Sequence, residues 1–171
     1  MKIQLVIPMS GIGKRFIDAG YKTPKPLLKV RSKEIIDHVV NMFQDIEKVI
    51  FICNKEHLND KNLNLKETLK SLHDKTSIIS IEPHKKGPIF AVTKAESILD
   101  PLLPTIVNYC DFNSLFSFSN FIDILEKYNP DGCVFTYTGF HPHMLGSTNY
   151  AFMRDKEQWM IEIKEKEPFT D

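Results

Sequence analysis

Short apolar runs alternate along the chain with segments whose apolar residues recur at helical spacing. Continuous apolar runs predict strands at residues 3–7, 48–53, 76–81, 105–109 and 132–137. Amphipathic spacing predicts helices at residues 33–43, in the second half of 55–73, at 88–99 and at 118–128. Two further strands, 150–153 and 159–163, are expected to flank a turn at 154–157. Strands that alternate with helices predict an α/β fold in three layers, α/β/α, around a mostly parallel sheet with right-handed crossovers.

The loops that follow three of these strands carry the polar residues of most interest. Parallel sheets bind ligands at the carboxyl ends of their strands. We therefore expect the loops after Ile7, Ile81 and Tyr109 to meet at one edge of the sheet. With no internal repeat, linker or low-complexity tract, residues 1–171 are expected to form a single domain.

The loop after the first strand combines glycines with cations in the run Ile7-Pro8-Met9-Ser10-Gly11-Ile12-Gly13-Lys14-Arg15-Phe16. Glycine lets backbone N–H groups approach an anion, and the start of a helix adds partial positive charge. Arg15 and Lys25, the latter between Pro24 and Pro26, can add full charges from two sides. The pattern predicts a cradle for a triphosphate.

Two other phosphate loops do not fit this run. A Walker-type loop requires Ser or Thr after Gly-Lys and a glycine five positions earlier, but the chain has Arg15 and Pro8 there. A dinucleotide fingerprint requires a small residue where the chain has Phe16.

The run Gly11-Ile12-Gly13-Lys14-Arg15-Phe16, then Gly20-Tyr21 and Pro24-Lys25-Pro26-Leu27, resembles the N-terminal signature of the sugar-phosphate nucleotidyltransferases, or nucleoside-diphosphate-sugar pyrophosphorylases. The short bacterial members encoded with capsule and surface-polysaccharide genes are the most similar type. Three later stretches follow in the order that this family requires: His84 to Ala91, Val107 to Phe112, and Ile163 to Pro168. The resemblance implies a Rossmann-like sheet of the nucleotidyltransferase (GT-A-like) type. It also implies that the chain lacks the family's C-terminal portion, which carries a second metal-binding acid.

The resemblance assigns roles to residues in each stretch. Asp111, which follows an apolar strand, is expected to hold Mg²⁺, a hard cation that takes carboxylate, phosphate and water oxygens; the alternative is a cap of the next helix. Gly87 is expected to lie against the nucleobase, although a plain turn before a helix is also consistent. On the acceptor side, the candidates are Lys25, His141, His143, Glu165 and Lys166. The expected nucleotide-binding residues are Met9, Ser10, Gly11, Gly13, Lys14, Arg15 and Gly87, and the expected catalytic residues are Arg15, Lys25 and Asp111.

Composition narrows the classes of partner. The chain has 22 cations, 22 anions and no long apolar segment, so we expect no nucleic-acid partner, no membrane and a cytoplasmic location. Cys53, Cys110 and Cys133 are widely spaced, which favours reduced thiols over a disulfide or zinc site. A homo-oligomer is left open.

The expected reaction joins a nucleoside monophosphate, taken from a triphosphate, to a phosphorylated acceptor of the sugar 1-phosphate kind, with release of pyrophosphate. Two alternatives stay open. One is a glycosyltransferase that uses a nucleoside-diphosphate sugar, although Asp111-Phe112-Asn113 offers one carboxylate where such enzymes use two. The other is a nucleotide-binding domain without catalytic activity.

Overall fold

The computed structural model describes residues 1–139 and 150–169. The chain forms two compact units, Met1–Tyr128 and Asn129–Asp171. The first unit contains the sheet and the loops that carry most of the predicted site residues.

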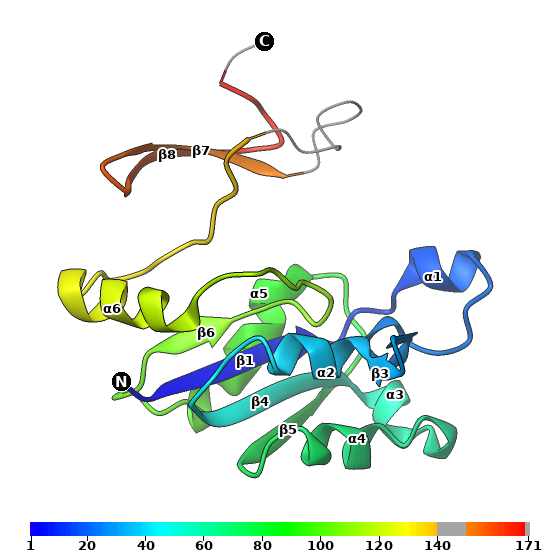
Figure 1. The fold of residues 1–171 in the computed structure, drawn as a ribbon. Helices are drawn as coiled ribbons and strands as arrows, with labels where there is room; N and C mark the ends of the chain where they lie inside the picture. Colours follow the sequence, from blue (N-terminus) through cyan, green and yellow to red (C-terminus); the bar gives the residue numbers. More distant parts are fainter. Residues whose placement is uncertain (140–149, 170–171) are drawn as a thin grey trace. The chain divides into compact units, whose positions relative to one another are not determined.

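The first unit is built on a parallel sheet of four strands (Figure 1). Its strands are β1 (Ile3–Met9), β4 (Ile46–Asn54), β5 (Thr76–Ile81) and β6 (Thr105–Val107), in the order β5-β4-β1-β6. β1 lies in the interior, where Val6 is paired with Ile50 of β4 and with Val107 of β6. The parallel α/β sheet predicted from the sequence is confirmed.

Helices cover both faces of this sheet (Figure 1). Helices α2 (Ile35–Val40), α4 (Leu65–Ser71) and α6 (Phe118–Tyr128) contribute to one buried cluster, together with Leu5 and Ile7 of β1. Helix α5 (Gly87–Val92) and the 3-10 helix η3 (Thr93–Ile98) pack on the opposite face, against Val6. Because successive strand side chains point to opposite faces, β1 supplies both cores. The three-layer arrangement is therefore confirmed.

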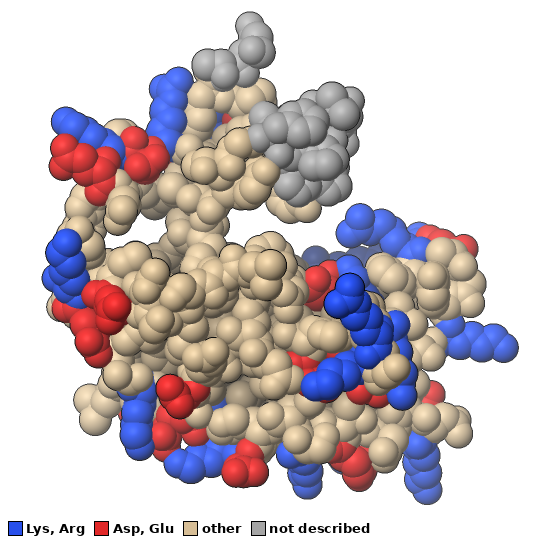
Figure 2. Space-filling model, viewed as in Figure 1, with Lys and Arg blue, Asp and Glu red and all other residues tan. Residues whose placement is uncertain are grey.

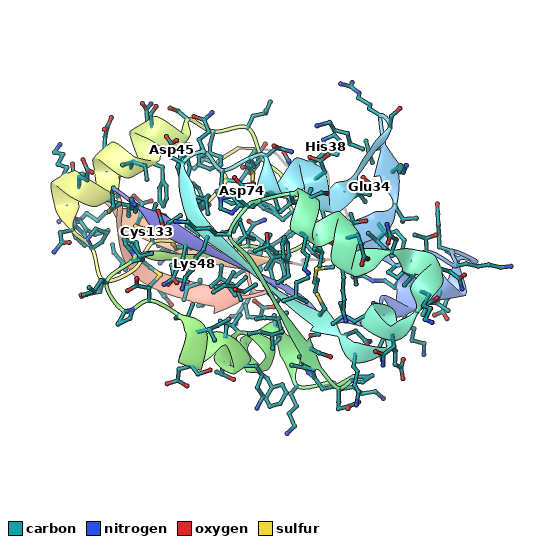
Figure 3. The ribbon with its side chains drawn as sticks, turned by 90° about the horizontal axis from the view of Figure 1, so that it is seen from below. Glu34, His38, Asp45, Lys48, Asp74 and Cys133 are labelled. Carbon is teal, nitrogen blue, oxygen red and sulfur yellow. The ribbon has the colours of Figure 1, made fainter. Side chains whose placement is uncertain are left out.

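Gln4 is a polar residue buried within β1. Its amide nitrogen donates to the carbonyl of Asp100 at 2.8 Å, and its amide oxygen accepts from the Asp100 N–H at 3.0 Å. A buried amide is tolerated when its hydrogen bonds are made inside the protein. A second link of this kind joins Lys48, which donates to the carbonyl of Ile98 at 2.7 Å (Lys48 is labelled in Figure 3). Both links fasten the connection between η3 and β6 to the sheet.

Short elements surround the carboxyl ends of the strands. They are α1 (Lys14–Asp18), η1 (Lys25–Leu27), α3 (Lys55–Asn59) and η2 (Lys61–Leu63), with the hairpin of β2 (Lys29–Val30) and β3 (Lys33–Glu34). The hairpin corrects the helix predicted from residue 33. Arg31 and Ser32, with φ of 48° and 70°, form a two-residue turn, and the strand pairing that it sets up delays α2 to Ile35.

In the described residues of the second unit, β7 (Ala151–Lys156) and β8 (Trp159–Glu165) form an antiparallel hairpin. Glu157 and Gln158 turn the chain, with φ of 51° and 70°. The turn predicted at 154–157 is thus displaced, because the charged residues Arg154 to Lys156 continue an exposed strand. The strand predicted at 132–137 is wrong. No strand forms in the described segment 129–139, where the apolar run has no partner strand for its backbone.

On the surface shown in Figure 2, cationic and anionic side chains are interspersed. The helices of residues 1–139 and 150–169 are all too short or too polar to cross a bilayer.

Candidate functional site

The loop after β1 begins with two buried residues, Met9 and Ser10. The side chain of Met9 belongs to the core and Ser10 is also buried, so Met9 can offer a ligand only its backbone. Gly13 precedes α1 with φ of +69°, a conformation that favours glycine. The carbonyl of Gly13 accepts from the N–H groups of Phe16 and Ile17, at 2.8 and 3.2 Å. An anion in this loop would therefore meet the N–H groups that precede Phe16.

Lys25 is held at the start of η1. The turn is closed by the Leu27 N–H, which donates to the carbonyl of Pro24 at 2.9 Å, and Pro26 is buried beneath it. The Lys25 ammonium forms an ion pair with the carboxylate of Asp111 and lies 4.9 Å from the centre of the Phe16 ring. The structure thus brings together two of the expected catalytic residues, Lys25 and Asp111, across 86 residues of sequence.

Asp111 lies in a turn beyond β6. The strand ends at Val107 instead of residue 109, although the Asn108 N–H still donates to the carbonyl of Val6 at 3.1 Å. The Asn108 side chain then donates to the carbonyls of Tyr109 and Phe112, at 2.9 and 3.1 Å, which fixes the turn around Asp111. The next helix, α6, begins at Phe118, so the alternative of a helix cap is excluded for Asp111.

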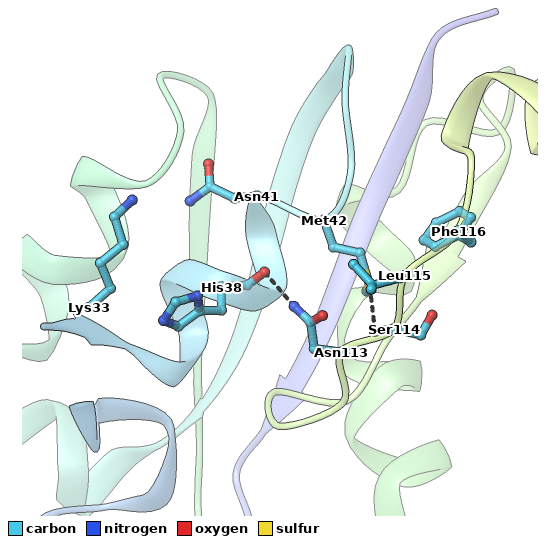
Figure 4. A pocket seen from close by; sticks show the side chains of 8 residues that line it. All are labelled: Lys33, His38, Asn41, Met42, Asn113, Ser114, Leu115 and Phe116. Carbon is cyan, nitrogen blue, oxygen red and sulfur yellow. Dashed lines mark hydrogen bonds between the residues drawn. The ribbon is translucent and has the colours of Figure 1, made fainter. Parts of the chain in front are cut away.

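Helix α2 holds the far end of the same loop. Asn113 donates to the backbone carbonyl of His38 at 2.9 Å, and the Ser114 N–H contacts the sulfur of Met42 at 3.2 Å (Figure 4). These residues line a pocket of about 320 Å³, together with Lys33, Asn41, Leu115 and Phe116. Arg15, Lys25 and Asp111 are not among the lining residues, so we treat this pocket as part of the support of the Asp111 loop.

The loop after β5 contacts the loop after β1. Nε2 of His84 lies 3.1 Å from the Ser10 hydroxyl, and Nδ1 accepts from the Lys86 N–H at 3.2 Å. Gly87 follows with φ of +81°, and a Cβ added there would meet nothing within 4 Å. This backbone conformation accounts for Gly87 without a ligand, so its contact with a nucleobase stays a prediction. The expectation that loops after three strands meet at one edge is confirmed by the Ser10–His84 and Lys25–Asp111 contacts.

Arg15 and Lys14 stand on the exposed side of α1. Within the described part of the chain, no carboxylate pairs with the Arg15 guanidinium. The next residue, Phe16, carries the ammonium of Lys25 against its ring. Arg15 is therefore on the same short helix that supports Lys25.

Two cysteines, the buried Cys53 and the partly buried Cys110, lie near this edge of the sheet. Burial raises the pKa of Cys110, next to Asp111, to about 12, and the Asp111 charge adds to the rise. Burial likewise raises the pKa of Cys53 in β4 to about 12. Both thiols stay protonated at neutral pH and are packing groups rather than nucleophiles.

The other acceptor-side candidates fall beyond the first unit in the sequence. His141 and His143 lie outside the described residues. Glu165 ends β8 in the second unit, where its carboxylate lies 3.8 Å from the Lys166 ammonium. The Lys166 N–H donates to the carbonyl of Tyr150 at 3.1 Å. A role for this pair at a sugar phosphate stays a prediction.

Four residues that position the site were not assigned such a role from the sequence: Phe16, His84, Asn108 and Asn113. Phe16 entered as the end of the signature run and as a residue too bulky for a dinucleotide loop. His84 entered as part of a later stretch, with Lys85 and Lys86 as basic residues that could line the entrance of the site. Asn108 and Asn113 are short polar residues on either side of Asp111, a pattern typical of tight loops. The partners of the Asn108 side chain are local, whereas the partner of Asn113, the carbonyl of His38, is too distant in sequence to be predicted from that pattern.

The fold and this edge define a class: α/β proteins with a parallel sheet whose ligand site lies at the carboxyl ends of the strands. The family model described as nucleotidyl transferase matches residues 5–166. The match covers most of the chain, and the chain therefore belongs to the nucleotidyl transferase family.

Individual proteins similar to this chain match either a short part of it or the whole of it at low sequence identity. A 2-C-methyl-D-erythritol 4-phosphate cytidylyltransferase from Wigglesworthia glossinidia brevipalpis is 36% identical over 58 residues, which are 32% of this chain and 24% of that protein. The matched segment thus spans about a quarter of that relative.

Solved structures match over nearly the whole chain. A nucleoside-diphosphate-sugar pyrophosphorylase from Vibrio cholerae RC9 superposes with a TM-score of 0.71 and 23% identity, covering 98% of this chain and 68% of that one. A UTP-bound UGPase from Acinetobacter baumannii gives 0.65 and 22%, with coverage of 98% and 69%. A UDP-glucose pyrophosphorylase complexed with UDP-glucose gives 0.64 and 17%, with coverage of 98% and 70%. At these identities the likeness shows a shared fold.

Proposed function

We propose that this protein transfers a nucleoside monophosphate from a nucleoside triphosphate to a phosphorylated acceptor of the sugar 1-phosphate kind. The contact of Lys25 with Asp111 beside the Arg15 helix, in a chain of the nucleotidyl transferase family, carries this proposal. The contact brings one cation and one carboxylate together, and the short helix that supports Lys25 also carries Arg15, which supports a polyphosphate site.

The proposed step is an in-line displacement at the α-phosphorus. An acceptor phosphate oxygen forms the new bond, the bond from the α-phosphorus to the bridging oxygen breaks, and pyrophosphate leaves with that electron pair. Because the acceptor oxygen is already ionised near pH 7, no general base is required. The rate then depends on alignment and on charge stabilisation. Arg15 would bind the leaving pyrophosphate, and Lys25 the α-phosphate or the incoming phosphate.

Asp111 would hold a magnesium ion in this site. Its carboxylate is 30% exposed and already faces a cation, so the donor and its surroundings fit a hard divalent ion. Residues 1–139 and 150–169 contain no cluster of three or more His, Cys, Asp or Glu side chains suited to a metal. Asp111 would therefore supply one protein ligand, with phosphate oxygens and water as the others. When bound, the ion would neutralise phosphate charge.

The names of the similar proteins support the substrate class. Two solved neighbours are named for UTP or UDP-glucose, and the sequence relative is named as a cytidylyltransferase. We propose a pyrimidine nucleoside triphosphate and a sugar-type phosphate acceptor as the first substrates to examine. Synthesis of capsule or surface polysaccharide is the proposed use of the product, on the basis of the sequence resemblance.

A pyrophosphate-release assay tests this function, with Mg²⁺, each of CTP, UTP, GTP and dTTP, and a panel of sugar 1-phosphates. Lys25→Ala is expected to lower the rate by about 10²- to 10³-fold, the effect of losing a preorganised charged donor. Lys29→Ala is the matched control, because Lys29 is an exposed lysine nearby that pairs with Glu34 at 3.6 Å. It should leave the rate unchanged, and both variants should keep the melting temperature. Full activity in Lys25→Ala would contradict the role of Lys25. Nucleotide binding by the wild-type protein without pyrophosphate release from any pair would favour a binding domain.

A further inference from the structure

We propose that His84 is a positioning residue that sets the two walls of the nucleotide site before a ligand arrives. The inference rests on the proposed function, since it concerns the same site. It assigns to His84 a link between the loop after β1 and the loop after β5, through Ser10 on one side and Lys86 on the other.

The two hydrogen bonds of His84 define its tautomer. Nδ1 accepts from the Lys86 N–H at 3.2 Å, so this nitrogen carries no proton. The proton of the neutral ring is then on Nε2, which lies 3.1 Å from the Ser10 hydroxyl and donates to it. The backbone of one loop therefore orients the ring, and the ring holds the side chain of the other.

The ring is also held by packing. The imidazole meets the ring of Phe90 in α5 edge to face, with centroids 4.7 Å apart and an interplanar angle of 67°. Phe90 in turn lies under the ammonium groups of Lys86 and Lys94, at 4.7 and 4.6 Å. Because His84 is only partly exposed and contacts α5 on this side, its direction toward Ser10 is restricted.

The link joins elements that the sheet does not join. β4 lies between β1 and β5, so the loops after β1 and β5 do not follow neighbouring strands. Ser10 is buried at the start of the glycine-containing loop, and Gly87 begins α5 directly after Lys86. A site whose walls are ordered in advance binds more tightly, because less conformational freedom is lost on binding.

Isothermal titration calorimetry with four nucleotides in the presence of Mg²⁺ measures the effect. The probe is whichever of CTP, UTP, GTP and dTTP binds the wild-type protein most tightly. In His84→Asn the amide oxygen can still accept from Lys86, but the side chain is too short to reach Ser10. In His84→Gln the amide nitrogen can reach Ser10. We expect His84→Asn to weaken nucleotide binding by about 2- to 10-fold, the range of one hydrogen bond, and His84→Gln to recover most of this loss.

A double-mutant cycle shows whether His84 acts through Ser10. Ser10→Ala removes the acceptor, so adding His84→Asn to it should weaken binding little further. Equal weakening by His84→Asn in both backgrounds would contradict a role through Ser10. Unchanged affinity in His84→Asn, with normal binding by the wild-type protein, would overturn the inference and leave the proposed function intact.

The NMR shifts of the His84 ring nitrogens test the link to Ser10 directly, because a purely structural role of His84 would not make them depend on Ser10. Nitrogen NMR of the labelled wild-type protein is expected to show the proton of His84 on Nε2, and in Ser10→Ala the Nε2 shift should change. A proton on Nδ1 would overturn the inference. Failure of the wild-type protein to bind any of the four nucleotides would instead contradict the proposed function, and the tautomer would still decide whether His84 links the loops.

Discussion

Lys25 and Asp111 pair with each other in the structure, and in the proposed complex each contacts a ligand instead. Both side chains are 30% exposed, so water screens the pair and its contribution to folding is small, about 0–1 kcal/mol. We infer that the pair keeps both groups in place until a cation and a phosphate take over their charges.

Replacing Lys25 should therefore change metal binding in the absence of nucleotide. Lys25→Met removes the ammonium that competes for the Asp111 carboxylate, and Mn²⁺ should bind about fivefold more tightly if about 1 kcal/mol of pairing is released. Electron paramagnetic resonance of free Mn²⁺ measures this affinity directly. Lys25→Met/Asp111→Asn is the control and should lose the gain. Unchanged or weaker Mn²⁺ binding in Lys25→Met would contradict the competition.

At the residue scale, the sequence was sufficient to propose charged residues for the candidate site, but not to predict the residues that hold them in place. Local patterns single out both residues, because Lys25 lies between two prolines and Asp111 follows the end of an apolar strand. The position of Asn113 under the carbonyl of His38 depends on a contact across 75 residues, and no local pattern indicates such a contact. Gly87 shows a different difficulty: a positive φ and a nearby ligand would both favour glycine at this position, so the sequence alone does not distinguish them.

At the element scale, charged side chains hold the start of strand β4. Glu47 accepts from Lys75 and pairs with Lys2 at 2.9 Å. The hydrogen bond from Lys75 has the largest effect and that from Lys2 the second largest. Together they lower the pKa of Glu47 from its ordinary value of 4.5 to about 2. The pair with Lys75 joins the start of β4 to the residue before β5.

This shift predicts a pH dependence of stability. A carboxyl whose pKa is lower in the folded state stabilises the fold above its ordinary pKa, and the contribution is lost as the pH falls from about 4.5 toward 2. Glu47→Gln should therefore be less stable than wild type above pH 5, and the difference should shrink as the pH falls toward 2. Urea unfolding at several pH values measures the difference. Glu96→Gln, at an exposed position of η3, is the control substitution. A constant difference for Glu47→Gln at all pH values would contradict the shifted pKa.

Elements with a strong local pattern were predicted within a residue or two, and those that depend on a distant partner were not. The strand Thr76–Ile81 and the helix Phe118–Tyr128 match their predicted bounds, because the apolar spacing is unambiguous in both. The hairpin at Lys29–Glu34 was missed because its turn residues, Arg31 and Ser32, are not the usual Asn-Gly type. The run at 132–137 has strand composition without a strand, because composition supplies no pairing partner.

At the scale of the first unit, topology explains why the site forms where it does. The order β5-β4-β1-β6 places β1 next to β6, so the loops that carry Arg15 and Asp111 leave the same edge of the sheet. Alternation of strands and helices in the sequence was sufficient to predict this edge. For the second unit, the expected contact of Glu165 and Lys166 with a sugar phosphate stays a prediction, because the local sequence pattern does not define long-range contacts.

The most direct measurement of the central claim is a crystal structure of the protein with Mg²⁺ and a non-hydrolysable analogue of the nucleotide that binds most tightly. We expect one triphosphate in contact with the Arg15 guanidinium and the Lys25 ammonium, with the metal ion bound to Asp111 and the Lys25–Asp111 pair separated. A triphosphate bound away from these three side chains, or a metal ion on other residues while Lys25 still pairs with Asp111, would contradict it.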